Sequence, residues 1–285
     1  MLSLILTLLL QASPVVDAKM GAVPDANLKS KLETSLPPDL NGIVDRIRLA
    51  IDTARYDEAD ALLQSYHDQL APTHGEDLTV LQAELILATG DPRGAEKAVS
   101  GLDPEGRFRC NILRIGGMAA QARGEADRSI AQLGTLAHDC SVTWRVWDVL
   151  GQILADQGER EASRFAFENA LAAPDHPATV AADYGHSLIQ FGLLDEASAM
   201  LSQSLDRDPT NKAAQHDLDY LTGIQGLEPS RREREGDTEW ARRLADAGDG
   251  ALHAGKSDLA RALYAQALIV SPQYDARLLE AADKP

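Results

Sequence analysis

The segment Gly250–Ser257 has the residue types and spacing of a phosphate-binding loop, because it reads Gly-Ala-Leu-His-Ala-Gly-Lys-Ser. In such a loop, backbone N–H groups and the lysine contact phosphate oxygens. That chemistry requires a strand before the loop, whereas the preceding run Trp240–Ala247 has the spacing of an amphipathic helix. We therefore interpret Gly255 as part of a turn between two helices. A nucleotide-binding enzyme that uses residues 250–257 is the alternative.

A second motif, Gly185-His186-Ser187, matches the start of a hydrolase nucleophile elbow. Ile189 occupies the position where that motif needs its second glycine, and the stretch lies inside a helical pattern. The seven histidines form no His-Glu-x-x-His spacing, and the two cysteines form no Cys-x-x-Cys spacing. We therefore expect no catalytic residue, no metal site and no cofactor, and the protein is not expected to be an enzyme.

The elements that carry these motifs are marked by recurring glycines. Gly90, Gly124, Gly158, Gly192 and Gly226 follow one another at a strict spacing of 34 residues. A fixed period of this length is typical of stacked-repeat proteins. Each glycine follows a helical run, where a left-handed residue commonly ends a helix.

A second glycine series, Gly117, Gly151 and Gly185, has the same spacing but lies within the helical runs. A glycine inside a helix costs about 1 kcal/mol relative to alanine, so it needs a packing reason. We expect a neighbouring helix to approach these positions closely. Pro174 and Pro209 end the helices that follow the turns. Each segment therefore predicts a helix, a tight turn and an antiparallel helix.

The residues at these positions resemble the tetratricopeptide repeat (TPR). The resemblance covers most of the chain after about residue 40 and implies an all-α, right-handed superhelical solenoid of antiparallel helix hairpins. The matching residues are Trp147, Leu150, Gly151, Leu154, Gly158, Phe167 and Ala170 in one segment, Tyr184, Gly185, Leu188, Gly192, Ala197 and Pro209 in the next, and Gly248, Gly255, Ala260, Tyr264, Ala267 and Pro272 near the C-terminus.

The repeats predict the domain organisation. Residues 40–226 form a solenoid of about five repeats and a half repeat, and the first turn has Ala54 where the others have glycine. The charged segment 227–238 is interpreted as a loop or hinge, or alternatively as a partner-binding arm. Residues 239–285 form a last unit, closed by a capping helix over 275–282 with a polar outer side.

The two cysteines fall in one predicted hairpin. Cys110 begins its first helix and Cys140 ends its second, so the two ends are neighbours in an antiparallel pair. A disulfide is therefore expected, provided that the Cα atoms lie within about 7 Å of each other. Two buried thiols at the helix ends are the alternative.

In the TPR family, the first helices of the pairs line a concave side that commonly holds a peptide or the tail of a partner. The resemblance therefore implies a protein or peptide partner, with a solvent-facing helix side as the alternative interpretation of each residue. The matching first-helix positions are Arg114, Met118, Gln121, Arg145, Asp148, Gln152, His186 and Gln190.

The composition is acidic, with 44 Asp and Glu residues against 27 Lys and Arg residues. This charge disfavours nucleic acid and anionic lipid as partners and is compatible with a basic partner. It is also what a well-solvated helical surface requires. Self-assembly through an exposed end helix is a third possible function, and homo-oligomers remain open.

The first residues, Met1–Leu10, are apolar and too few to span a bilayer, which is typical of a signal peptide. Small residues allow cleavage after Ala18, so we predict that residues 1–18 form a signal peptide and that residues 19–39 form a linker. The mature chain is then expected to be a periplasmic or secreted protein without a membrane span. Translation from Met20 would instead give a cytoplasmic protein. A narrower resemblance, to TPR proteins of Flp-type (Tad) pilus assembly, rests on the turn sequences and on Asp208-Pro209.

Overall fold

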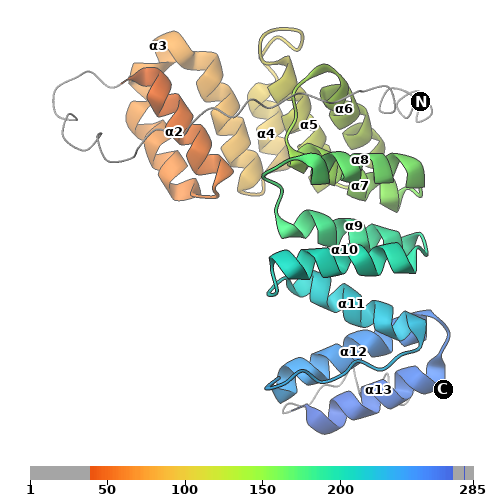
Figure 1. Cartoon of the computed structure of the whole chain (residues 1–285). Helices are drawn as coiled ribbons and strands as arrows, with labels where there is room; N and C mark the ends of the chain where they lie inside the picture. Colours follow the sequence, from red (N-terminus) through yellow and green to blue (C-terminus); the bar gives the residue numbers. More distant parts are fainter. Residues whose placement is uncertain (1–38, 272–278, 280–285) are drawn as a thin grey trace. The chain divides into compact units, whose positions relative to one another are not determined.

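The computed structural model describes residues 39–271 and residue 279 (Figure 1). Within these residues the regular elements are helices, and no strand occurs. The predicted all-α class is therefore confirmed. The signal peptide of residues 1–18, the linker 19–39 apart from Asp39, and the capping helix 275–282 apart from Leu279 lie outside the described residues.

The chain divides into two compact units, Met1–Val142 and Thr143–Pro285. The division falls inside the range 40–226, where the sequence predicts one solenoid without an internal boundary. The described helices of unit 1 are α2 (Leu40–Asp52), α3 (Tyr56–Ala88), α4 (Pro92–Val99), α5 (Arg109–Ala122) and α6 (Ala126–Asp139). Each packs against its neighbour in the sequence, and α5 and α6 form a hairpin.

Helix α3 is two repeat helices joined through a kink at His74, where φ is −131° and ψ is 26°. Pro72 lies just before the kink and has no N–H group to donate to the helix ladder. The part before His74 is the second helix of the first predicted repeat, and the part after it is the first helix of the next.

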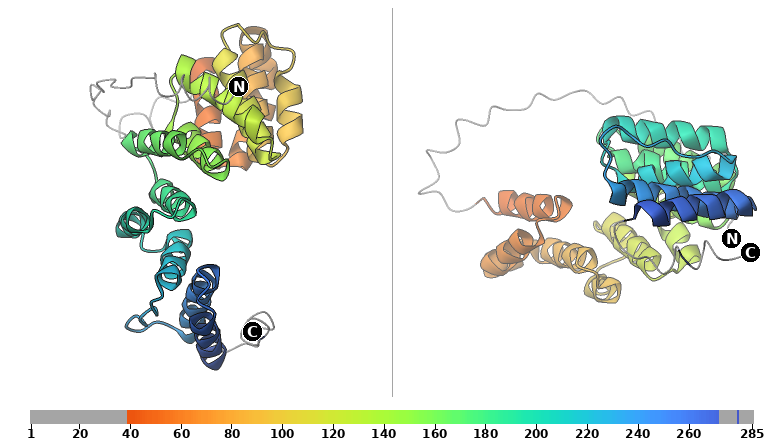
Figure 2. Two further views of the ribbon diagram at one scale, coloured as in Figure 1. Left: turned by 90° about the vertical axis from the view of Figure 1, so that its right-hand side faces the viewer. Right: turned by 90° about the horizontal axis from the view of Figure 1, so that it is seen from below.

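The described residues of unit 2 form three hairpins and a single helix, which run from green to blue in Figure 2. The single helix is α11, which packs against α9 and α10 on one side and against α12 on the other. The hairpins are α7 (Trp144–Asp156) with α8 (Arg160–Ala172), α9 (Ala178–Gln190) with α10 (Leu194–Arg207), and α12 (Asp237–His253) with α13 (Ser257–Val270), and α11 spans Lys212–Gln225.

The glycines of the first series have the left-handed conformation that the sequence predicts. Their φ angles are 95° at Gly90, 73° at Gly124, 76° at Gly158, 72° at Gly192 and 81° at Gly226. Ala54, which replaces glycine in the first turn, has the same conformation with a φ of 55°.

The glycines of the second series lie where the two helices of a hairpin touch. A Cβ atom at any of them would overlap a buried side chain of the second helix. The nearest atoms would be 2.4 Å away in Leu133 for Gly117, 2.8 Å in Phe167 for Gly151, and 2.7 Å in Leu201 for Gly185. Phe167 then stacks on Tyr184 of the next hairpin, with ring centroids 4.9 Å apart. The α7–α8 and α9–α10 hairpins are thus packed internally and against each other.

Cys110, near the start of α5, and Cys140, just after α6, form a disulfide with an S–S distance of 2.09 Å. Their Cα atoms are 6.1 Å apart, within the limit that the hairpin geometry had to meet. Beside the bridge, Arg109 Nη2 pairs with Asp139 Oδ2 at 2.6 Å. The bridge therefore closes the open end of the α5–α6 hairpin.

Helices α11 and α12 approach each other through two glycines that do not belong to either series. A Cβ atom at Gly223 would lie 1.8 Å from the carbonyl oxygen of Ala247, and one at Gly250 would lie 1.9 Å from that of Tyr220. The two backbones are in contact at this point, so no side chain fits. Because α12 begins at Asp237, the charged loop before it spans residues 227–236.

Candidate partner-binding face

The eight residues predicted to bind a partner are divided between the two units. Arg114, Met118 and Gln121 lie on α5 of unit 1. Arg114 forms an ion pair with the buried Glu84 of α3, which also accepts a hydrogen bond from Asn111 Nδ2 at 3.3 Å. Arg114 therefore joins two first helices of unit 1 as well as facing solvent in part.

The other five predicted residues lie in unit 2, on the neighbouring helices α7 and α9. Gln152 Nε2 donates to Asp148 Oδ2 at 3.0 Å, and Gln190 Nε2 donates to Asp156 Oδ1 at 3.5 Å across the two helices. The guanidinium of Arg145 lies 5.3 Å from the centre of the Trp144 ring.

A cavity of about 210 Å³ opens between α7 and α9. Three of the predicted residues, Gln152, His186 and Gln190, line this cavity, and Asp148 accepts a hydrogen bond from Gln152. The lining residues are Gln152, Asp156, Asp183, His186, Ser187 and Gln190. The structure therefore brings together Asp148, Gln152, His186 and Gln190, in a site of polar character.

The sequence prediction did not include Asp156, Asp183 or Ser187. The repeat period could have indicated the two carboxylates, because Asp156 is 34 residues before Gln190, and Asp183 is 34 residues before Asp217. Polar side chains thus recur in register on the first helices, as the glycines do.

Two carboxyl groups at or beside the cavity, those of Asp148 and Asp183, have raised pKa values. Burial, together with the nearby charge of Asp183, raises the pKa of Asp148 to about 7, although the bond from Gln152 acts in the opposite direction. The pKa of Asp183 is also raised, chiefly by burial. Both shifts show that negative charge is poorly accommodated here.

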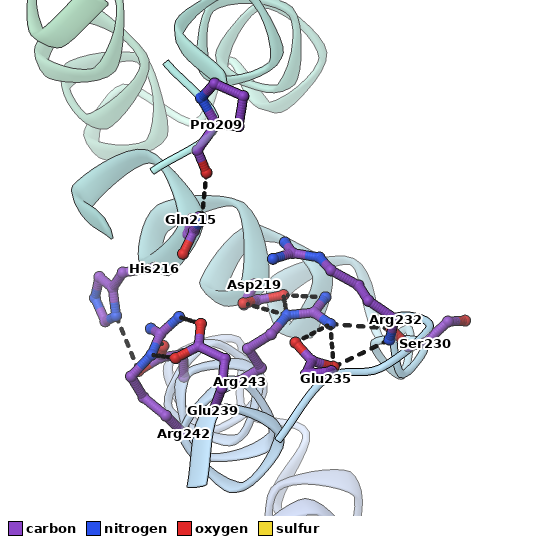
Figure 3. Close-up of polar contacts among 11 residues, drawn as sticks. Pro209, Gln215, His216, Asp219, Ser230, Arg232, Glu235, Glu239, Arg242 and Arg243 are labelled. Carbon is purple, nitrogen blue, oxygen red and sulfur yellow. Dashed lines mark hydrogen bonds and ion pairs between the residues drawn. The ribbon is translucent and has the colours of Figure 1, made fainter. Parts of the chain in front are cut away.

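Acidic residues continue from this cavity onto α11 and α12, and we call Asp148, Asp156, Asp183, Asp217 and Asp246 the acidic row. The members of the row on α11 and α12 have basic partners. His186 Nδ1 lies 3.0 Å from Asp217 Oδ2, and His216 Nδ1 lies 2.9 Å from Asp246 Oδ1. These hydrogen bonds raise the pKa of each histidine. Arg242, labelled below His216 in Figure 3, also pairs with Asp246.

The charged loop 227–236 is fixed to unit 2 by Arg243 of α12, as Figure 3 shows. The guanidinium donates to both oxygens of Asp219 on α11, at 2.8 to 3.1 Å. Its Nη1 also donates to the carbonyl oxygen of Ser230 at 3.0 Å and to Glu235 at 3.3 Å. The loop therefore contacts a buried ion pair between α11 and α12.

The segment with phosphate-loop spelling does not form a loop around an anion site. Gly250–His253 belong to α12, and Gly250 is the residue that contacts α11. Gly255, with a φ of 72°, makes the turn, and Lys256 Nζ donates to the carbonyl oxygen of Ile224 at 2.8 Å. The interpretation as a helix turn describes this geometry, and the nucleotide-binding alternative gains no support.

The second motif also lies within a helix. Gly185, His186 and Ser187 are consecutive residues of α9, and Ser187 Oγ donates to the backbone carbonyl oxygen of Asp183 at 3.0 Å. Gly185 packs against Leu201 of the second helix. These residues therefore serve hairpin packing and line the cavity.

The fold is an all-α solenoid of stacked helix hairpins, of the TPR type. Among solved structures, the chain is similar to the APC/C hetero-tetramer Cut9–Hcn1, with a TM-score of 0.55 and 16% identity over 87% of this chain. It spans 50% of the length of that chain. At this identity the likeness shows the fold alone.

A second solved structure, a tetratricopeptide repeat protein from Parabacteroides merdae, aligns with a TM-score of 0.48 and 12% identity, over 85% of this chain and 97% of that chain. No family model and no curated protein matches the sequence. Within the described residues, no helix is both long enough and apolar enough to cross a membrane.

Proposed function

We propose that this chain is a non-catalytic scaffold that binds a protein or peptide, and that the partner binds on the first-helix side of unit 2. The observation that carries the proposal is the convergence of Asp148, Gln152, His186 and Gln190, from two hairpins, around one polar cavity. In stacked repeats, the positions that are not needed for packing are free to bind a partner.

A site-specific photo-crosslinker tests this proposal. The crosslinking residue replaces Gln190, beside the cavity, or Glu168, an exposed residue of the second helix α8. We expect one protein to be crosslinked through position 190 in native extract and to be absent at position 168. Equal capture at both positions, or no specific capture at position 190, would contradict the proposal.

We further propose that the protein is exported and acts in the periplasm or outside the cell. Two features support this: the apolar segment Met1–Leu10, and the Cys110–Cys140 disulfide, because such bridges persist mainly in oxidising compartments. Cell fractionation and the mass of the mature protein test it. Export with cleavage after Ala18 leaves Lys19 as the first residue, whereas cytoplasmic protein from Met20 with free thiols would overturn it.

In that compartment, the scaffold would serve envelope, pilus or secretion-system assembly. The support is the resemblance of the turns and of Asp208-Pro209 to TPR proteins of pilus assembly. Identification of the partner crosslinked through position 190 tests this assignment. A partner with no part in an envelope assembly would refute it and leave the scaffold proposal intact.

A further inference from the structure

The cavity between α7 and α9 is rich in acceptors and poor in available cations. It contains the carboxylates of Asp156 and Asp183, and His186 is the only basic residue among those that line it. His186 is already bonded to Asp217. Ser187 donates to a backbone carbonyl, so its hydrogen is also in use. The groups that remain to meet a ligand are chiefly carboxylate and carboxamide oxygens.

Asp148 adds an independent observation. Its exposed fraction is 7%, and its Oδ1 atom is buried without any hydrogen-bond partner. Its other oxygen accepts a hydrogen bond from Gln152, which lines the cavity, and the charge of Asp183 on the neighbouring helix acts on Asp148. A buried carboxylate oxygen without a partner is costly, and a cation placed nearby offsets that cost.

The rest of the acidic row does not need such a ligand. Asp217 has His186 as its partner, and Asp246 has His216 and Arg242. Among the acidic row, the carboxyl groups without an ion pair to a described arginine or histidine are therefore those at the α7–α9 end, Asp148, Asp156 and Asp183. This points to one pocket for one cationic group, rather than to a continuous anionic track.

We propose that this cavity binds a lysine or arginine side chain of the partner protein, held by Asp156 and Asp183, with Asp148 linked to the cavity through Gln152. The inference rests on the proposed function and names the chemistry of the partner. Charge-assisted hydrogen bonds to carboxylates are the strongest class available to such a side chain. The net charge of −17 would also favour the approach of a basic segment.

The test uses short fluorescent peptides of alternating arginine and serine, with versions that have citrulline or glutamate in place of arginine. Binding to the full chain is measured by anisotropy at physiological salt. We expect the arginine peptide to bind about tenfold or more tightly than the citrulline peptide. We expect Asp156→Asn/Asp183→Asn to weaken it by a similar factor.

The matched control removes two negative charges elsewhere, with Asp195→Asn/Asp206→Asn at exposed positions of α10. This pair should change the affinity by less than about twofold. An equal loss of affinity in both double variants would show nonspecific electrostatic attraction and overturn the inference. Equal affinity for the citrulline and arginine peptides would also overturn it. If Asp183→Asn perturbs folding, the test uses the exposed Asp156→Asn variant alone, which should weaken the affinity for the arginine peptide by about threefold or more.

Failure of this inference differs from failure of the proposed function. If the citrulline or glutamate peptide binds and substitutions at Asp156 and Gln190 abolish that binding, the face binds peptides but not through a cation. If no peptide responds to these substitutions and position 190 crosslinks no protein, both proposals fail.

Discussion

At the scale of single residues, Ala54 occupies a turn position that the repeat elsewhere gives to glycine. Its φ of 55° is unfavourable for a side chain with a Cβ atom. We expect Ala54→Gly to raise the free energy of unfolding by about 0.5–1 kcal/mol, because relief of strain outweighs the added freedom of the unfolded chain. Urea denaturation measures the change.

The matched control is Gly124→Ala, at a φ of 73° with open space around the added Cβ atom. It should lower the free energy of unfolding by about the same amount, since only backbone strain is introduced. A loss of stability in Ala54→Gly would mean that this turn does not require the left-handed conformation.

Asp148 makes stability depend on pH. With its pKa raised to about 7, the folded protein retains a proton that the unfolded chain releases near pH 4. The free energy of unfolding therefore decreases as pH rises from about 4 to 7. We expect Asp148→Asn to stabilise the protein by on the order of 2–4 kcal/mol at pH 8 and by close to zero at pH 4.

Urea unfolding at both pH values measures this difference, with Asp156→Asn, a change to an exposed carboxylate, as the control. If Asp148→Asn raised the free energy of unfolding equally at pH 4 and pH 8, the cause would be better packing rather than relief of a buried charge.

At the scale of elements, loop 227–236 separates α11 from α12, and Arg243 of α12 joins that loop to α11. The exposed fraction of Arg243 is 7%, and that of Asp219 is 3%. We expect Asp219→Ala to lower the free energy of unfolding by about 3 kcal/mol, because it leaves a buried guanidinium short of a partner. The loop should also become more sensitive to trypsin after Arg231 and Arg232.

Glu233→Ala, at an exposed position of the same loop, is the control and should change neither property. Unchanged proteolysis in Asp219→Ala would show that the ion pair does not hold the loop in place.

The contact between α11 and α12 depends on two glycines. An alanine Cβ atom at position 250 would lie 1.9 Å from a backbone carbonyl oxygen, so the helices must separate. We expect Gly250→Ala to lower the free energy of unfolding by about 2 kcal/mol or more, in spite of the higher helix propensity of alanine. Thermal and urea unfolding measure it.

Gly75→Ala is the control, because a Cβ atom at position 75 meets nothing within 4 Å. It should be neutral or slightly stabilising. Equal effects of the two substitutions would contradict the close approach of α11 and α12.

The sequence predicted the elements that the 34-residue period governs. Helix-ending glycines such as Gly158, and packing glycines such as Gly151, have a physical role that repeats, so spacing alone identifies them. Gly223 and Gly250 lack that signal, since neither belongs to a glycine series and α12 lies outside the register of the other first helices. Their role depends on a contact between two helices that no spacing rule relates.

The candidate site was predictable only where its residues follow the repeat. First-helix positions gave Gln152, His186 and Gln190, which line the cavity. The burial of Asp148 and the effect of Asp183 on its pKa could not be predicted, because both depend on how closely α7 and α9 pack. The sequence therefore indicated the first-helix face, and the packing determined which carboxyl groups on that face lack an ion pair.

At the scale of the whole molecule, the disulfide and the cavity belong to different compact units. The bridge joins residues 110 and 140 of unit 1, whereas the residues lining the cavity begin at position 152, in unit 2. In stacked repeats, stability is approximately a sum of local terms and nearest-neighbour terms. A change to the bridge should therefore act on the α5–α6 hairpin and leave α9 unaffected.

We expect Cys110→Ser/Cys140→Ser to lower the free energy of unfolding of unit 1 by about 2–4 kcal/mol, since the bridge closes a separation of 30 residues. Hydrogen exchange should accelerate in α5 and α6 while α9 and α11 keep their protection, and binding of the arginine peptide should be unchanged. Mild reduction of the wild-type protein should reproduce the pattern. A parallel loss of protection in α9, or a loss of peptide binding, would show that the two units unfold together and that the bridge supports the site.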